Sequence, residues 1–195
     1  TEQGLLKMLD MSGKADFQTN FEELNIIPMS ISYEYEPCDI FKAREMVISR
    51  KRKYVKAEGE DFKSIVTGIM QQKGSIHMNI GTSLTSDEIA AAALCDKNDR
   101  YQLIRHAVDQ RIIDGYKLWK NNYIAYDIAN QGFKYSHLYD QSEVEAFVTY
   151  MQHQLDTVEP EINREDLRRI FIDIYANPVF TKELLEKEKR TGNIL

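Results

Sequence analysis

Proline and glycine are scarce in this sequence, with four prolines and nine glycines among 195 residues. This scarcity argues against a disordered chain and against an all-β fold, because both are rich in turn-forming residues. Cysteine is rarer still: Cys38 and Cys95 are the only two. Two thiols so far apart indicate neither a disulfide framework nor a Cys-x-x-Cys metal site. We therefore expect a globular chain with reduced thiols.

The sequence also lacks an excess of positive charge and any long apolar run. Its 25 basic and 31 acidic residues give a net charge of −6, so we expect no nucleic-acid partner. The longest apolar run, residues 89–94, is far short of the ~20 residues of a membrane-spanning helix. Residues 1–24 do not have the pattern of a signal peptide. We expect a cytoplasmic protein whose membrane contact, at the inner face, is peripheral.

Hydrophobic periodicity predicts two strands in the first half of the chain. Residues 27–35 alternate between apolar and polar positions, and so do residues 75–81. A period of two is typical of half-buried strands. The expected apolar faces consist of Ile27, Met29, Ile31, Tyr33 and Tyr35 in the first strand and of Ile76, Met78 and Ile80 in the second.

Helical patterns account for most of the remaining sequence. Asp39 is a candidate cap for one helix, residues 62–72 form another, and Thr85 with Glu88 has capping-box spacing. From about residue 96 the pattern is helical only, which divides the chain into residues 1–95 and a helical extension, residues 96–195. Within the extension, the expected caps are Ser142, Asn163 and Thr181, and a break is expected at Asn177-Pro178.

The first predicted strand carries the apolar-Pro-apolar core Ile27-Pro28-Met29. It resembles the last conserved block of the glycerolipid acyltransferases, which acylate glycerol-3-phosphate or its lyso-phosphatidate product. Two weaker similarities are the strand that ends at Gly81 before a capped helix, and the segment of residues 122–127. The resemblance covers residues 1–130. It implies an α/β fold: the C-terminal portion of an acyltransferase-type sheet with flanking helices, followed by the all-helical extension.

Members of this family transfer a fatty acyl group from an acyl thioester, on CoA or acyl carrier protein, to a glycerol-phosphate acceptor. Their base is the histidine of an His-x4-Asp motif. None of the four histidines in this chain completes that motif. The resemblance therefore implies a C-terminal fragment of an enzyme of phospholipid synthesis. We expect no catalytic residue, metal or resident cofactor in this chain; the thioester is a co-substrate.

The polar faces of the two predicted strands offer candidate substrate-binding residues. Ser30 and Ser32 lie on the first strand and His77 on the second. If the strands are neighbours, these side chains line a cleft. The alternative is that this face is hydrated or covered by a helix.

A basic stretch supplies the other candidates, Arg50, Lys51 and Arg52, which are followed by Lys53 and Lys56. Clustered cations attract phosphate head groups, an acidic carrier protein or an anionic membrane. The alternative is that such a run is a solvated face, because acidic residues 58, 60 and 61 follow closely.

Two further expectations concern partners. A sheet severed from its first half exposes an edge, which predicts self-association through that edge. A second hypothesis about function, from another class, is a self-sufficient, non-catalytic helical module whose apolar stripes bind a partner protein. A small hydrolase is disfavoured because the chain lacks a G-x-S-x-G nucleophile elbow.

Overall fold

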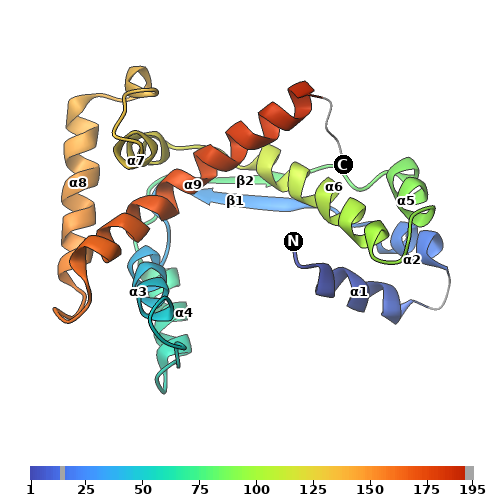
Figure 1. The fold of residues 1–195 in the computed structure, drawn as a ribbon, viewed down its shortest axis with the longest axis horizontal. Coiled ribbons are helices and arrows are strands. Elements are labelled where there is room, and N and C mark those ends of the chain that lie inside the picture. The colour runs from blue at the N-terminus through green and yellow to red at the C-terminus, as the bar shows by residue number, and fades with distance from the viewer. Residues whose placement is uncertain (14–15, 192–195) are drawn as a thin grey trace. The chain divides into compact units, whose positions relative to one another are not determined.

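The computed structural model describes residues 1–13 and 16–191, and it is mostly helical, with 65% helix (Figure 1). Two short strands, β1 (Met29–Tyr33) and β2 (Ile76–Ile80), form an antiparallel sheet. The helices are α1 (Gln3–Ser12), α2 (Phe17–Leu24), α3 (Asp39–Ser49), α4 (Glu60–Met70), α5 (Ser86–Ala93), α6 (Asp99–Gly115), α7 (Lys120–Ala129), the 3-10 turn η1 (Ser136–Leu138), α8 (Gln141–Asp156) and α9 (Arg164–Thr191).

The expected α/β fold, with part of an acyltransferase-type sheet, is therefore wrong. Both predicted strands are present but shorter than expected, since β1 begins only after Ile27-Pro28, and within the described chain they pair only with each other. Gly81 N–H donates to the carbonyl of Pro28 and Glu34 N–H to that of Ser75, each at 2.9 Å, which sets the antiparallel register. Alternating hydrophobicity identifies a strand but does not reveal how many neighbours it has, and this is why the prediction overestimated the sheet.

The described chain forms two compact units. Unit 1 contains residues 1–31, 77–116 and those after 183, and unit 2 contains residues 32–76 and 117–183. In unit 1 the core includes Phe21 and Ile104, from α2 and α6. In unit 2 it includes Phe147 and Phe171, from α8 and α9. The predicted division at residues 95–96 concerned a change in sequence pattern, and it stays a prediction.

Capping rules locate several helix ends. The capping box of Thr85 and Glu88 begins α5, as expected. The side chain of Asn163 accepts a hydrogen bond from Asp166 N–H at 2.8 Å at the start of α9, also as expected. The prediction for α8 was two residues late: the box consists of Asp140 and Glu143 instead of beginning at Ser142.

Pro178 does not break the chain, because α9 continues through it. A proline inside a helix removes one backbone hydrogen bond and strains the preceding turn. Its neighbours Tyr175, Ala176 and Val179 are all at most 2% exposed in the core of unit 2. Burial on both sides of the proline keeps the helix continuous here, which sequence punctuation alone does not predict.

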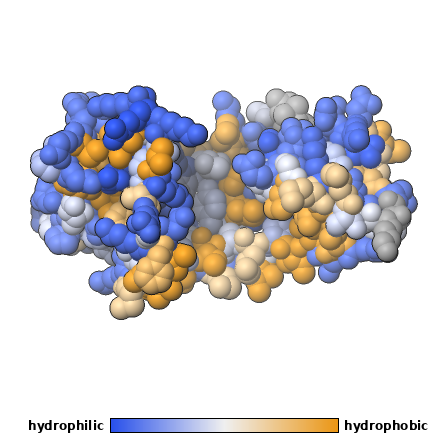
Figure 2. Space-filling model, turned by 90° about the horizontal axis from the view of Figure 1, so that it is seen from below, coloured by the Kyte–Doolittle hydropathy of each residue, from blue (hydrophilic) through white to orange (hydrophobic). Residues whose placement is uncertain are grey.

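The strand pair presents its apolar side to solvent. We call this surface of unit 1 the outer strand face; its members are Met29, Ile31, Met78 and Ile80, each between 43% and 69% exposed. On the opposite side Ser30 is only 6% exposed. The backbone of α6 approaches so closely there that a Cβ on Gly115 would lie 2.8 Å from Ser30 Oγ and 2.2 Å from Asn79 Nδ2. Hydrophobic side chains at the molecular surface are coloured orange in Figure 2.

This orientation predicts opposite effects for two adjacent substitutions. Ile31→Lys should change the free energy of unfolding by less than about 0.5 kcal/mol, because the side chain is already in solvent. Ser30→Lys should cost about 2–4 kcal/mol, because a long cation does not fit under Gly115. Urea unfolding of the two variants measures both values. A larger loss for Ile31→Lys would mean that the strand faces are the other way round.

Candidate functional site

The predicted substrate-binding residues of the strands do not form an open cleft around Ser30. Ser30 is buried, and its Oγ has no hydrogen-bond partner in the described part of the chain. Ser32 Oγ accepts a hydrogen bond from Lys117 N–H at 2.9 Å. His77 is half-buried on β2. Because Gly115 covers Ser30, this part of the polar face resembles the covered alternative, and substrate binding by the three residues stays a prediction.

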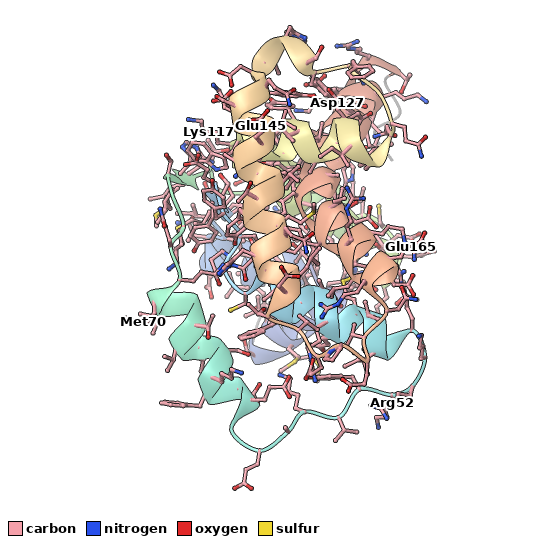
Figure 3. The ribbon with its side chains drawn as sticks, turned by 90° about the vertical axis from the view of Figure 1, so that its left-hand side faces the viewer. Arg52, Met70, Lys117, Asp127, Glu145 and Glu165 are labelled. Atoms are coloured by element: carbon pink, nitrogen blue, oxygen red, sulfur yellow. The ribbon has the colours of Figure 1, made fainter. Side chains whose placement is uncertain are left out.

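The predicted basic residues Arg50, Lys51 and Arg52 follow α3 and are all exposed. Figure 3 shows Arg52 at the edge of unit 2. Arg52 and Lys53 line a groove of about 350 Å³ together with Arg44 and Tyr54. The structure thus brings Arg52 to a concave surface, where it has a second cation beside it.

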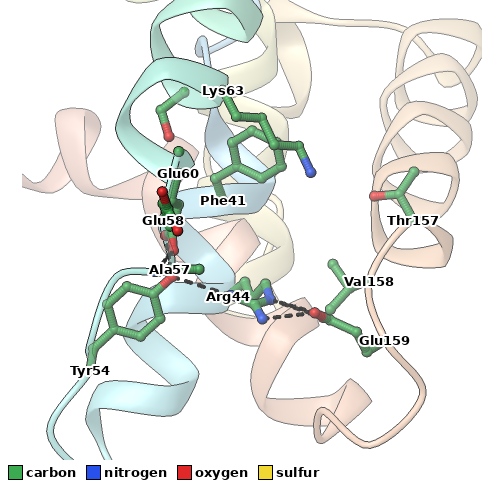
Figure 4. Close-up of a pocket in the computed structure, with 12 residues that line it drawn as sticks. Phe41, Arg44, Tyr54, Ala57, Glu58, Glu60, Lys63, Thr157, Val158 and Glu159 are labelled. Carbon is green, nitrogen blue, oxygen red and sulfur yellow. Dashed lines mark hydrogen bonds and ion pairs between the residues drawn. The ribbon is translucent and has the colours of Figure 1, made fainter.

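A second groove, of about 390 Å³, shares Arg44 and Tyr54 with the first (Figure 4). Its walls come from α3, from residues 54–59, from the first turns of α4 and from residues 157–159. No histidine or cysteine is among the residues that line it. The groove therefore offers hydrogen-bonding groups that could orient a polar ligand.

Arg44 is the central side chain of these two grooves, and its guanidinium is already occupied. Its Nε and Nη2 donate to the carboxylate of Glu159 at 2.9 and 2.7 Å, and its Nη1 donates to the Tyr54 hydroxyl at 3.3 Å. The hydrogen bonds from Arg44 lower the pKa of Glu159 to about 2. Tyr54 in turn donates to Glu60. A phosphate ligand would therefore have to compete with Glu159 for Arg44.

Lys63 is the other cation of the second groove. Its ammonium lies 5.3 Å from the centre of the Phe41 ring, a cation–π contact that is worth about 0.5–1 kcal/mol at an exposed site. Such a weak contact leaves Lys63 able to turn toward a ligand, so it is the residue of this groove best suited to meet an anion.

Asp39 does not cap α3 as predicted: Cys38 occupies the cap position, and Asp39 is the first residue of the helix, at the centre of unit 2. The side chain is fully buried, and its Oδ2 accepts hydrogen bonds from the hydroxyls of Tyr150 and Tyr175, each at 2.7 Å. Its Oδ1 accepts from Ile40 N–H at 2.7 Å. Burial raises the pKa of Asp39, and the tyrosine hydrogen bonds oppose that rise. No sequence signal links these residues, because the tyrosines are 111 and 136 positions away.

The same cluster fastens α4 to α3. Gln71, just after α4, donates from Nε2 to the Tyr150 hydroxyl and accepts from Cys38 N–H, both at 3.1 Å. The thiol of Cys38 donates to the carbonyl of Ser64 at 3.3 Å. Burial raises the pKa of Cys38, so the thiol stays protonated. A raised pKa disfavours a reactive thiolate at Cys38, and the hydrogen bonds of Asp39 connect α3 to α8 and α9.

Comparison with known proteins found no match: no family model, no curated protein and no solved structure matches this chain. The resemblance to the glycerolipid acyltransferases consequently stays a prediction from the sequence. In the described residues, no helix is both long enough and apolar enough to cross a membrane. Among the residues that the structure describes, no three histidine, cysteine, aspartate or glutamate side chains are grouped so that they could hold a metal ion.

The Asp39 cluster predicts a strong effect of one hydroxyl group. Tyr175→Phe removes the donor to Asp39 and the acceptor of Glu36 N–H, which lie 2.7 and 2.9 Å from the hydroxyl. We expect a loss of about 2 kcal/mol in the free energy of unfolding, because a buried carboxylate loses a donor.

The matched control is Tyr35→Phe. The Tyr35 ring packs on Tyr150, with 4.6 Å between ring centres, but its hydroxyl has no hydrogen-bond partner among the described residues. We expect Tyr35→Phe to lie within about 0.5 kcal/mol of the wild type in thermal or urea unfolding. Equal losses in the free energy of unfolding of the two variants would show that the hydrogen bond to Asp39 does not stabilise unit 2.

Proposed function

We propose that this chain is the non-catalytic, C-terminal part of an acyltransferase of phospholipid synthesis. Such an enzyme transfers a fatty acyl group from an acyl thioester to a glycerol-phosphate lipid precursor. The sequence basis is the resemblance carried by Ile27-Pro28-Met29, a segment of which only Met29 lies in β1. The proposal is for a non-catalytic part because the residues present contain no His-x4-Asp motif. The structural observation that supports the proposal is the outer strand face.

An uncovered apolar strand face favours a chain that functions as part of a longer protein or of a complex. A two-stranded ribbon is marginally stable in water by itself. Contiguous exposed apolar surface usually marks an interaction site, and covering it gains about 25 cal/mol per Å². In the proposed enzyme, the catalytic part packs on the outer strand face.

Helix α4 supports a lipid-related function, because none of its residues is buried. Its apolar side chains recur at the spacing of one helical face, and we call them the α4 stripe: Phe62, Ile65, Val66, Ile69 and Met70, between 40% and 78% exposed. The opposite side of α4 faces the protein, where a Cβ on Gly68 would lie 3.6 Å from Cys38 Sγ. Met70 points away from the other helices in Figure 3.

The α4 stripe follows the basic stretch by only a few residues, and both belong to unit 2. An amphipathic helix with cations nearby is typical of segments that lie in a membrane interface. We propose that α4 and Arg50–Lys53 contact an anionic membrane, where the acceptor lipid is found.

Vesicle binding tests this contact. The double variant Ile65→Glu, Ile69→Glu should bind phosphatidylglycerol vesicles roughly tenfold more weakly than the wild type, and so should Lys51→Glu, Arg52→Glu. Leu94→Glu is the control, because Leu94 is 90% exposed and lies outside both segments. If all variants bound phosphatidylglycerol vesicles as tightly as the wild type does, a role of these segments in membrane contact would be contradicted. If the wild type bound phosphatidylcholine vesicles as tightly as phosphatidylglycerol vesicles, contact with an anionic membrane would be contradicted.

The second candidate function is a self-sufficient, non-catalytic helical module that binds a partner protein. The outer strand face favours it for the same physical reason, since a partner covers apolar surface as well as a catalytic part does. Self-association through the strand edge stays a separate prediction, because it pairs backbone groups and leaves the outer strand face uncovered. The two candidate functions differ in whether the natural protein also contains an acyl-transfer centre.

The deciding experiment is the intact mass of the natural gene product with peptide mapping and an acyl-transfer assay. We expect a mass above 22.7 kDa, an His-x4-Asp peptide, and transfer of labelled palmitoyl groups to glycerol-3-phosphate or lyso-phosphatidate. Substitution of that histidine by alanine should abolish transfer, and Ile31→Lys should destabilise the longer protein while sparing this chain. A mass near 22.7 kDa would support the interaction module instead.

A further inference from the structure

A third groove lies within unit 2, between the end of α7 and the start of α8, and we call it the α7–α8 groove. Its volume is about 470 Å³. Two buried residues, Ile124 and Asp127, are at most 3% exposed and mark its floor. Val144 adds a second aliphatic wall, and Phe133, which is 82% exposed, stands at the rim. The groove therefore combines apolar walls with a buried carboxylate.

The charge of this groove has one sign. Asp127 and Asp140 both line it, and no lysine, arginine or histidine does. Asp140 caps α8, where its Oδ1 accepts from Ser142 Oγ at 2.6 Å and from Glu143 N–H at 3.0 Å. These hydrogen bonds lower the pKa of Asp140, so it is charged at neutral pH. A positively charged ligand therefore suits this surface.

Asp127 has one satisfied and one unsatisfied oxygen. Its Oδ2 accepts from the Tyr139 hydroxyl at 2.7 Å and from Tyr135 N–H at 2.9 Å. Its Oδ1 is buried and has no hydrogen-bond partner in the described chain. A buried carboxylate oxygen without a donor is costly and rare in native proteins, and a bound water, ion or ligand is one way to satisfy it.

We propose that the α7–α8 groove binds an alkylammonium or guanidinium group. The cation donates a hydrogen bond to Asp127 Oδ1, its alkyl chain packs against Ile124 and Val144, and the exposed Phe133 ring covers its charge by a cation–π contact. The cation comes either from a free amine or from a lysine or arginine side chain of a partner. This proposal does not rest on the acyltransferase assignment.

Nuclear magnetic resonance titration of the 195-residue chain tests the site. The probe is n-butylammonium, and its neutral counterpart is butan-1-ol. We expect n-butylammonium to shift the amide signals of residues 127–141 saturably, and butan-1-ol to leave them nearly unchanged. Absence of a saturable shift, or equal binding of the alcohol, would overturn the proposal.

Asp127→Asn is the decisive variant. Its amide oxygen can keep the hydrogen bonds from Tyr139 and Tyr135, while its NH₂ group replaces the acceptor Oδ1. Loss of a charge-assisted hydrogen bond should weaken n-butylammonium binding roughly tenfold or more. The control, Glu165→Gln, removes one exposed carboxylate elsewhere in unit 2 and should bind as the wild type does. Equal affinity of Asp127→Asn and Glu165→Gln would refute the proposed contact.

Phe133→Ala keeps the test decisive if Asp127→Asn fails to fold, because so exposed a side chain contributes little to stability. It should weaken binding roughly two- to fivefold through the lost cation–π contact, and an unchanged affinity would count against the proposed pose.

The peptide Ala-Lys-Ala distinguishes the two sources of the cation. Tighter binding of the peptide than of n-butylammonium identifies a partner side chain, and the reverse order identifies a free amine.

Discussion

The buried carboxylate of Asp39 is the interaction on which the arrangement of unit 2 depends. It receives hydroxyl donors from α8 and α9, through Tyr150 and Tyr175, at the first residue of α3. Gln71 extends the same cluster to the end of α4. Burying a carboxylate is unfavourable unless its oxygens are satisfied, so alternative packings that separate these helices leave an uncompensated charge. Four helices are thereby held in one arrangement by polar contacts whose geometry is specific.

This polar attachment determines which side of α4 is outside. Because Ser64, Gly68 and Gln71 face Cys38 and its neighbours, the apolar residues of the same helix have to point into solvent. The part of β1 in unit 1 shows the same inversion, since Ser30 is covered and Ile31 is not. Exposed apolar surface is unfavourable in water, and a partner that covers it gains the corresponding hydrophobic free energy on binding. Both surfaces are therefore available for contact with the partners proposed above.

Local structure could be predicted well from the sequence, and long-range structure could not. Alternation located both strands, and the Thr85–Glu88 capping box was correct, because these signals depend on neighbouring residues alone. The α/β fold was wrong because the number of strand partners is a long-range property, and the break at Pro178 was wrong because core packing outweighs one lost backbone hydrogen bond. The role of Asp39 was missed for a related reason: the tyrosines that donate to its carboxylate belong to distant segments. The contacts of Asp127 are local, with Tyr135 and Tyr139, but the sequence does not reveal that its side chain is buried.

The grooves of unit 2 differ in what their charged groups leave available to a ligand. Arg44 already donates hydrogen bonds from Nε and both terminal nitrogens to Glu159 and Tyr54. An anion that binds Arg44 has to break some of these bonds, so its net gain in binding free energy is small. Asp127 has the opposite balance, because one oxygen is satisfied and the other is buried without a donor. Binding free energy comes from the difference between the free and the bound state, so an unsatisfied group contributes more than a paired one. The α7–α8 groove has fewer charged groups than the grooves around Arg44. Its unsatisfied Asp127 oxygen nevertheless makes it the better candidate for ligand binding.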